Sequence, residues 1–341
     1  MSRLRAFLSR RRRVLRGVIV LLVVTAAACS PAAPPALQEF RLSRKHMGTE
    51  VTLTVLHASE ETARAAIVAA FAEIERLEAT LSPYRASSEV ARLNRAGSFD
   101  AGPETLFVIG KALHFHRLSG GAFDISVQPI LDLYGRSFAS GAGPPGDEEI
   151  RRTLELVDAG AIEISGNRIS MPPGMQITPG GIAKGYAVDR AAAVLRERGI
   201  HHGLVNAGGD MAAIGRNRTR PWSIALKDPR RSGFVTVLPL EDRAVATSGD
   251  YERFFEPSRR FHHIIDPRTG YSATELASVT VVAGTALAAD ALATSLFVLG
   301  PTAGLELVET LPSVEALLVT PAGEVLMSSG LETRCESASS R

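Results

Sequence analysis

The feature that most constrains the fold is a long stretch of one-sided apolar periodicity at residues 59–81, SEETARAAIVAAFAEIERLEATL. Apolar side chains recur there at steps of three and four residues, which predicts an amphipathic helix. Ser59, followed by two glutamates, is a typical helix N-terminus. The preceding residues 50–57, EVTLTVLH, alternate between apolar and polar side chains and predict a strand. The apolar helix positions are Ala63, Ile67, Ala70, Phe71, Ile74, Leu77 and Leu81.

The rest of the chain mixes helix and strand signals without a regular alternation. A second helix is predicted at 103–118, with proline at its start and two glycines after its end. Residues 160–172 predict a hairpin, and the Gly-, Ser- and Pro-rich residues 134–148 predict a surface loop. Further helices are predicted at 184–199 and 285–300, and strands at 203–206, 222–226, 234–238 and 277–283. The pattern does not fit a doubly wound parallel sheet, so we expect an α+β domain with mixed or antiparallel sheets and packed helices.

Residues 1–28 have the layout of a signal peptide: a basic stretch, an apolar run and small residues before Cys29. The apolar run, residues 18–24, is shorter than the about 20 residues that span a bilayer. The small residues resemble the lipobox of bacterial lipoproteins, in which the cysteine is acylated, although Ala26 stands where leucine is usual. Ordinary signal cleavage is the alternative. The run SRRRRVL at residues 9–15 also resembles a twin-arginine export signal, so two export routes are open.

Composition narrows the class of protein further. Residues 29–37, CSPAAPPAL, predict an extended tether, and residues 38–341 the folded domain. The expected location is the cell envelope, on the periplasmic side of a bacterial membrane, with a lipid anchor on Cys29. The formal net charge is only +2, with much of the basic excess in the first 16 residues, which argues against a nucleic-acid partner. The chain has only one other cysteine, Cys335, so acylation of Cys29 would leave no internal disulfide.

Two segments carry residues suited to chemistry. ITPGGIAKGYAVD, residues 177–189, has glycines that allow close backbone approach to a ligand, followed by a helix start. It is not a Walker A loop, because Ala183 and Gly185 flank Lys184, and a strand-to-helix turn with a surface lysine is the alternative. Asp290 and Thr294 lie four residues apart on a predicted helix rich in Ala and Leu. An unpaired buried carboxylate is costly, and these oxygens suit a hard cation such as Mg²⁺.

Two further segments, NAGGD at residue 206 and HHIIDPRTG at residue 262, are explained equally well by turn chemistry. Taken together and in order, however, eight blocks of the chain resemble the ApbE family, the FAD:protein FMN transferases. The blocks are MGTEV at 47, LSPYRASSEVARLN at 81, GAFDISVQPI at 121, GGIAKGYAVD at 180, NAGGD at 206, ATSGDYER at 246, HHIIDPRTG at 262 and ADALATSLFVLG at 289. They extend over residues 42–328, and the lipoprotein-like N-terminus agrees with them independently.

The resemblance implies a single T-fold-related flavin transferase domain. It implies transfer of FMN from FAD to a Ser or Thr hydroxyl of a target flavoprotein, with Mg²⁺ bound and AMP released. The implied FAD contacts are Met47, Tyr84, Ala122, Phe123, Asp124, Thr178, Lys184 and Ile264, with Tyr84 against the isoalloxazine ring. The implied magnesium ligands are Asp290, Thr294 and the backbone carbonyl of Gly181. His263 matches a histidine implicated in catalysis and is the first choice of base, with Asp290 the second.

One departure from the family pattern concerns Thr178 and Pro179, because the family usually has aspartate where Thr178 stands. Threonine is a weaker hydrogen-bond acceptor than a carboxylate, so weaker FAD binding or a shifted contact is expected. Two alternatives use the same residues: a metal-dependent FAD pyrophosphatase that gives FMN and AMP, and a non-catalytic periplasmic flavin-binding lipoprotein. The presence of Asp290, Thr294 and His263 argues against the second alternative. A self-flavinylated carrier is disfavoured, because the sequence has no clear acceptor motif of the Asp-x-x-Ser/Thr-Gly-Ala-Thr kind.

Overall fold

The computed structural model describes residues 36–331, and the structural statements that follow concern these residues. The predicted signal peptide, Cys29 and most of the tether lie outside them, as does Cys335. The centre of the fold is an eight-stranded sheet in which every neighbouring pair is antiparallel. In spatial order its strands are β1 (Gln38–His46), β2 (Thr49–His57), β6 (Gly203–Ala207), β7 (Asp210–Ile214), β10 (Ala244–Gly249), β11 (Ser278–Ala283), β12 (Glu315–Val319) and β13 (Val325–Met327).

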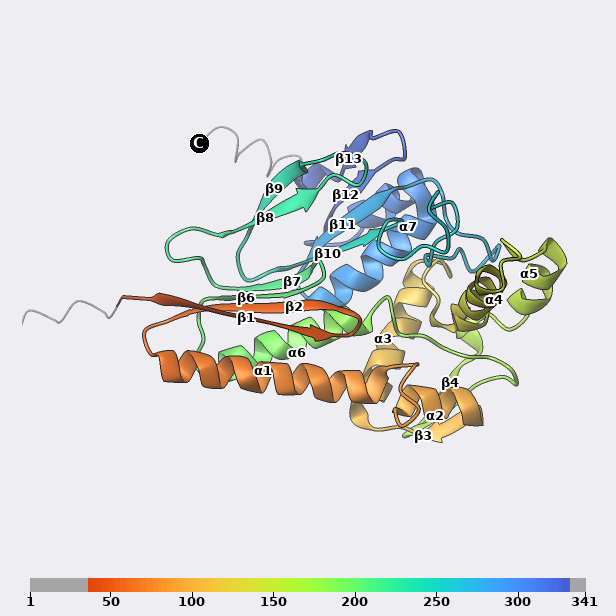
Figure 1. Ribbon diagram of the computed structural model, residues 1–341, viewed down its shortest axis with the longest axis horizontal. Helices are drawn as coiled ribbons and strands as arrows, with labels where there is room; N and C mark the ends of the chain where they lie inside the picture. Colours follow the sequence, from red (N-terminus) through yellow and green to blue (C-terminus); the bar gives the residue numbers. More distant parts are fainter. Residues whose placement is uncertain (1–35, 332–341) are drawn as a thin grey trace, which may run out of the picture. The chain divides into compact units, whose positions relative to one another are not determined.

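Three helices cover one face of this sheet: α1 (Glu60–Leu81), α6 (Ala183–Glu197) and α7 (Ala286–Glu309) (Figure 1). Helices α1 and α6 pack beside each other under β1, β2, β6 and β7, and α7 packs on β10 and β11. All seven apolar positions predicted for α1 are buried, and the Ser59 side chain accepts a hydrogen bond from the Thr62 backbone N–H at 3.2 Å. The other face packs against the hairpin of β8 (Trp222–Lys227) and β9 (Phe234–Leu240) through a second apolar cluster.

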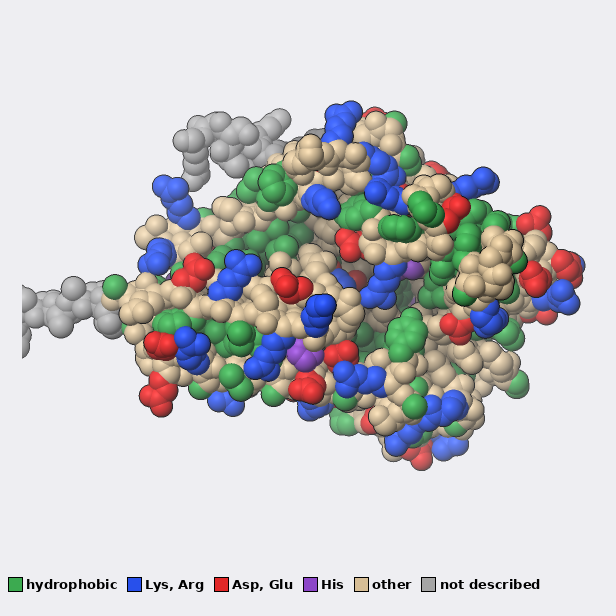
Figure 2. Space-filling view, viewed as in Figure 1, with side chains coloured by type: hydrophobic (Ala, Val, Ile, Leu, Met, Phe, Trp, Pro, Cys, Tyr) green, Lys and Arg blue, Asp and Glu red, His purple; other side chains and the backbone are tan. Residues whose placement is uncertain are grey.

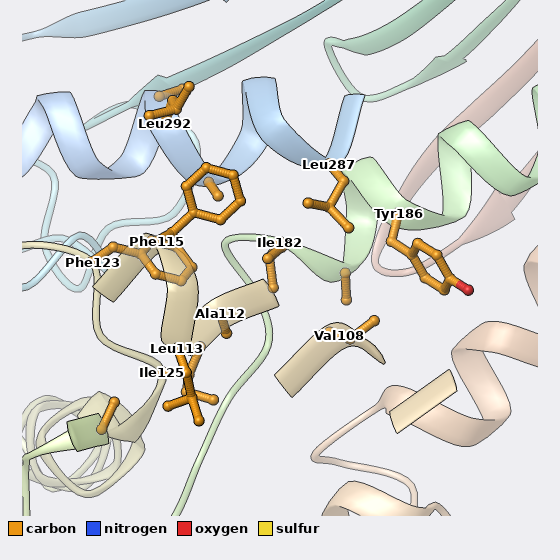
Figure 3. Close-up of a cluster of buried hydrophobic side chains, with 14 of the residues drawn as sticks. Val108, Ala112, Leu113, Phe115, Phe123, Ile125, Ile182, Tyr186, Leu287 and Leu292 are labelled. Atoms are coloured by element: carbon orange, nitrogen blue, oxygen red, sulfur yellow. The ribbon is translucent and has the colours of Figure 1, made fainter. Parts of the chain in front are cut away.

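A helical region adjoins the helix-covered face. Its helices are α2 (Glu89–Ala96), α3 (Pro103–Leu118), α4 (Gln128–Ala139) and α5 (Asp147–Leu154), with the 3₁₀ turns η1 (Ile125–Val127) and η2 (Ala159–Ala161). A small sheet in the order β3 (Ser98–Asp100), β5 (Arg168–Ser170) and β4 (Glu163–Ser165) belongs to it. Figure 3 shows side chains of the apolar cluster that this region shares with the main layer: Phe115 of α3 and Phe123, Ile182 before α6, and Leu287 and Leu292 of α7.

The α+β prediction is confirmed, and so are the helix at 103–118 and the hairpin. The loop predicted at 134–148 is wrong at both ends, because α4 continues to Ala139 and α5 begins at Asp147. Tyr134 of α4 is fully buried and stacks on Phe255 with ring centroids 5.5 Å apart. The helix predicted to end at Gly300 is also longer than expected. Gly300, with φ 79°, breaks the helical backbone, but Pro301 begins another helical segment that continues to Glu309.

Candidate active site

A cavity of about 380 Å³ opens between the main sheet, its helices and the helical region. Its lining comes from the β1–β2 turn, the loop after α1, the segment around η1, the start of α6, the end of β10, residues 252–265 and α7. Figure 2 shows a hollow on this face with both basic and acidic side chains around it. The predicted site residues that line the cavity are Tyr84, Ala122, Phe123, Asp124, Thr178, Gly181, Lys184, His263, Ile264, Asp290 and Thr294.

Met47 is the predicted site residue that the cavity does not include. Its side chain is half-buried and packs against two core clusters, while its neighbour Gly48 lines the cavity. Met47 and Gly48 form the two-residue turn between β1 and β2, and both have left-handed backbone conformations, with φ values of 52° and 75°. The turn therefore contributes backbone atoms to the cavity wall, whereas the Met47 side chain packs against the core and holds the turn in place.

The base of the cavity is built where α6 and α7 approach each other closely. A Cβ atom added to Gly185 would lie 2.2 Å from the backbone oxygen of Ala286, so only glycine permits this approach. The Gly185 backbone N–H donates to Oδ2 of Asp290 at 2.9 Å. Asp189 accepts hydrogen bonds from the backbone N–H groups of Ala286 at 2.7 Å and Leu287 at 2.9 Å, and so caps the N-terminus of α7. These contacts hold the Asp290 carboxylate against the first turn of α6.

Buried charges meet at this junction. Asp210, at the start of β7, is fully buried and forms an ion pair with Lys184. Asp290 is 5% exposed, and its burial together with the nearby Asp210 carboxylate raises its pKa to about 8. Burial also raises the pKa of Asp210, whereas the two carboxylates raise the pKa of Lys184 despite the opposing effect of its burial. When both acids are ionised, two carboxylates share one ammonium group, and the cluster carries a surplus negative charge.

The oxygen donors beside this cluster fit a hard divalent cation. Thr294 lies one turn after Asp290 on α7, with its Oγ1 3.2 Å from Oγ of Ser248. A Cβ atom added to Gly181 would lie 3.1 Å from the same Oγ1, so the Gly181 backbone borders Thr294. Carboxylate, hydroxyl and carbonyl oxygens are ligands that Mg²⁺ accepts, and a bound cation would favour the ionised form of Asp290 by offsetting the second negative charge. Residues 36–331 contain no group of three His, Cys, Asp or Glu side chains placed to hold a metal, so such a site depends on these neutral oxygens and on a ligand.

His263 lies in the long segment between β10 and β11, with Nδ1 2.9 Å from the backbone oxygen of Arg253. A carbonyl oxygen can only accept, so Nδ1 carries the hydrogen and Nε2 keeps its lone pair. Burial, aided by the positive charges of Arg253 and Lys184, lowers the pKa of His263 to about 4. The imidazole is therefore neutral at pH 7 and can accept a proton at Nε2.

Apolar walls and exposed aromatic side chains complete the cavity. Phe123 and Ile264 are buried, whereas Tyr84 is 75% exposed at the rim, where a planar ligand can stack on it. Oγ1 of Thr178 accepts a hydrogen bond from the Gly180 backbone N–H at 3.3 Å, which leaves its own hydroxyl hydrogen free to donate. Thr178 thus stabilises the glycine turn and faces the cavity at the same time.

Asp124 lines the cavity, but its carboxylate is engaged by other parts of the protein. Oδ1 accepts from the Ser126 backbone N–H at 2.6 Å, and Oδ2 accepts from the Ala159 backbone N–H at 2.9 Å. Oδ2 also lies 3.3 Å from Nδ1 of His116, and this contact raises the pKa of the histidine. These contacts hold residues 122–126 of the cavity wall in place. The carboxylate of Asp124 therefore has a structural role in the wall.

Three residues of this site were missed from the sequence: Asp189, Asp210 and Arg253. All three belong to segments that the sequence singles out, with Arg253 at the end of the block ATSGDYER, but glycines and turn chemistry explained the segments of Asp189 and Asp210 equally well. Arg253 lines the cavity and was not assigned a role. Only the pairing of distant segments identifies these residues, because Lys184 and Asp210 lie on different elements and so do Asp189 and Ala286.

Comparison with known proteins gives one consistent result. The sequence profile of the ApbE family matches residues 47–318. A Vibrio cholerae protein named FAD:protein FMN transferase is 35% identical over 248 residues, which cover 69% of this chain and 74% of that protein. A Treponema pallidum protein of the same name is 33% identical and covers 79% of this chain and 81% of its own length. The crystal structure of the ApbE protein from Thermotoga maritima superposes with a TM-score of 0.80 at 32% identity, covering 87% of this chain and 99% of that one.

Proposed function

The chain belongs to the ApbE family, and from this premise we propose that it is an FAD:protein FMN transferase acting on a Ser or Thr hydroxyl of a target flavoprotein. The observation that carries the proposal is the composition of the single cavity described above. It combines an exposed aromatic at its rim, an oxygen-rich cluster around Asp290 and a neutral histidine. Its volume lies within the range of about 300–1,000 Å³ that is usual for small-molecule sites.

The reaction is a phosphoryl transfer to an alcohol, so positioning and charge neutralisation supply most of the catalysis. The hydroxyl oxygen of the target attacks the phosphorus on the FMN side of the FAD pyrophosphate. The bond from that phosphorus to the bridging oxygen breaks, and AMP leaves with that oxygen. Nε2 of His263 takes the hydroxyl proton, because it is the unprotonated nitrogen of a neutral ring. Tyr84 orients the isoalloxazine ring, and the walls formed by Phe123 and Ile264 exclude water from the reacting atoms.

Magnesium is part of this proposal. Asp290, Thr294 and the carbonyl of Gly181 would hold it, and when bound it supplies positive charge for the pyrophosphate and the departing phosphate. The chain itself holds Asp290 in place through the Gly185 backbone N–H. Because the Asp290 carboxylate is held by this hydrogen bond and would also hold the metal, His263 is the side chain left to accept the proton.

One experiment separates the proposed activity from its rivals. The chain is incubated with FAD, Mg²⁺ and a candidate acceptor flavoprotein domain, and the acceptor is then denatured and examined for covalent flavin. Covalent flavin on the acceptor, together with free AMP, supports the transferase. FMN that appears only in solution would favour a pyrophosphatase, and unchanged FAD with saturable binding would favour a storage or scavenging protein.

The envelope location is a further part of the proposal. Its support is the signal-like layout of residues 1–28 and the small residues before Cys29. We expect expression of the full chain in a bacterial host to give a membrane-associated, acylated protein. Replacement of Cys29 by serine would release the protein into the soluble periplasmic fraction, whereas an unchanged distribution would favour ordinary signal cleavage.

A further inference from the structure

The charges that line the cavity do not, by themselves, suit the anionic pyrophosphate of FAD. Four residues of the lining are acidic, and only two, Lys184 and Arg253, carry a cationic side chain. The carboxylates are those of Asp124, Asp132, Glu252 and Asp290. A pyrophosphate entering this site therefore needs a positive side chain that is not already neutralised by an acid, in addition to any metal ion.

Lys184 does not meet that requirement, because its ammonium group is paired with the fully buried carboxylate of Asp210. Breaking this pair to bind a phosphate would leave Asp210 as an unpaired buried charge, which is strongly unfavourable. Asp290 lies close enough to add to the negative potential around the same ammonium group. Lys184 is thus a structural counter-ion of the acid cluster, although the family pattern implies a contact with FAD.

Arg253 has the opposite character. Within residues 36–331, its guanidinium group has no ion pair and no hydrogen bond, although it lines the cavity. Its position is restricted nonetheless: a Cβ atom added to Gly48 would lie 3.2 Å from Nη2 of Arg253, so the guanidinium group rests against the β1–β2 turn. Its backbone oxygen accepts from the backbone N–H of His263 at 3.1 Å and from Nδ1 of the same residue at 2.9 Å. Two hydrogen bonds to the Arg253 backbone oxygen therefore link the unpaired arginine to the neutral histidine.

We propose that Arg253 binds the pyrophosphate of FAD and is the cationic side chain that stabilises the departing AMP phosphate. This inference rests on the proposed transferase function and adds a catalytic residue to it. A planar guanidinium group can donate two parallel hydrogen bonds to phosphate oxygens, which a lysine cannot do. The negative charge on the AMP phosphate grows as the bond to phosphorus breaks, so the contribution of the guanidinium group is larger in the transition state than in the bound substrate.

The test compares ligands that do and do not carry phosphate. Arg253→Gln keeps the backbone carbonyl that orients His263 and removes only the charge. We expect its affinity for FAD and for AMP to fall about 10- to 100-fold, the range for losing a hydrogen bond to a charged group, as measured by calorimetric titration. Riboflavin, which has no phosphate, should bind the variant as tightly as the wild type. Arg253→Lys should recover part of the affinity for FAD.

Arg260→Gln is the matched control, because Arg260 lies in the same loop, is exposed and does not line this cavity. Its affinities for FAD, AMP and riboflavin should equal those of the wild type. Equal losses for riboflavin and FAD in Arg253→Gln would mean that the arginine only maintains the shape of the loop. Unchanged binding of FAD and AMP would likewise overturn the assignment.

The transfer assay separates this inference from the proposed function. If the wild type transfers FMN, Arg253→Gln should raise KM for FAD and also lower kcat, and wild-type values of both would refute the inference. If the wild type transfers nothing, the proposed function fails. The phosphate-dependent loss of binding in Arg253→Gln would then still establish Arg253 as the pyrophosphate ligand of a binding protein.

Discussion

Replacement of Gly185 by alanine should destabilise the fold and weaken the candidate metal site at the same time. The new Cβ would lie 2.2 Å from the Ala286 backbone oxygen and 2.8 Å from the Leu287 backbone nitrogen, whereas ordinary contacts begin at 3.4 Å. Helices α6 and α7 must then separate by roughly 1 Å, which takes the Gly185 N–H out of hydrogen-bond range of Asp290, now 2.9 Å away. Overpacking costs about 1–3 kcal/mol, and a lost hydrogen bond to a buried carboxylate costs a similar amount.

We therefore expect Gly185→Ala to lower the free energy of unfolding by about 3–5 kcal/mol, and Tm by about 10 °C. Denaturant unfolding measures the first quantity, and calorimetric titration with Mg²⁺ shows whether the site around Asp290 is also weakened. The matched control is Gly110→Ala in α3, where an added Cβ meets no atom within 4 Å. That change should be neutral or stabilising by up to about 1 kcal/mol. Equal stability and equal Mg²⁺ affinity for Gly185→Ala and the wild type would refute the close approach of the two helices.

Three further predictions concern the cavity lining. Tyr84→Ala should weaken flavin binding about 10-fold in a fluorescence titration without changing Tm, because the ring is 75% exposed and packs on a ligand only when one is bound. Thr178→Asp should tighten FAD binding, since a carboxylate can retain the bond from Gly180 N–H and still offer an oxygen to the ligand; an equal or lower affinity would show that the site has adapted to threonine. The imidazole of His263, followed by NMR, should stay neutral down to about pH 5, because its pKa is lowered to about 4. The unfolded chain then binds the proton more readily than the folded one, so this residue's contribution to stability should decline as the pH falls from 6.5 towards 4, and an ordinary pKa near 6.5 would contradict the burial argument.

Local patterns in the sequence were sufficient for elements whose side chains alone determine them. Helix α1 was predicted because a single apolar stripe faces the sheet, and the β4–β5 hairpin because its turn residues are specific. Strand β1 could not be recognised in this way. Most of its residues are exposed, so it lacks the alternation of a half-buried strand, and it is identified by its pairing with β2. Strand β10, with the sequence AVATSG, could not be predicted for a similar reason. Its small residues give no strand signal, and they fit the close packing of this strand against α7.

The candidate site shows the same limit. The motifs around Gly181, His263 and Asp290 were visible in the sequence, and the fold brings them to one cavity. The ion pair of Lys184 with Asp210 could not be predicted, because in the sequence Asp210 is explained as part of a glycine turn. Sequence patterns therefore located the site, whereas long-range contacts decided which of its charges are available to a ligand.

The buried acid pair allows a final test of what Asp290 is for. Buried ion pairs contribute little to stability, because desolvation offsets their attraction. Here Lys184 and Asp210 already form a pair, and Asp290 adds a second buried acid beside it. Asp290→Asn should therefore make the metal-free protein more stable towards denaturant at neutral pH, because the wild-type side chain, with its pKa raised to about 8, must take up a proton on folding or stay ionised beside Asp210. The same variant should lose the stabilisation by Mg²⁺, which for the wild type amounts to about 2.7 kcal/mol at a concentration of 100 times Kd. An aspartate kept for structure alone would give the reverse, a less stable variant and no response to Mg²⁺ in either protein.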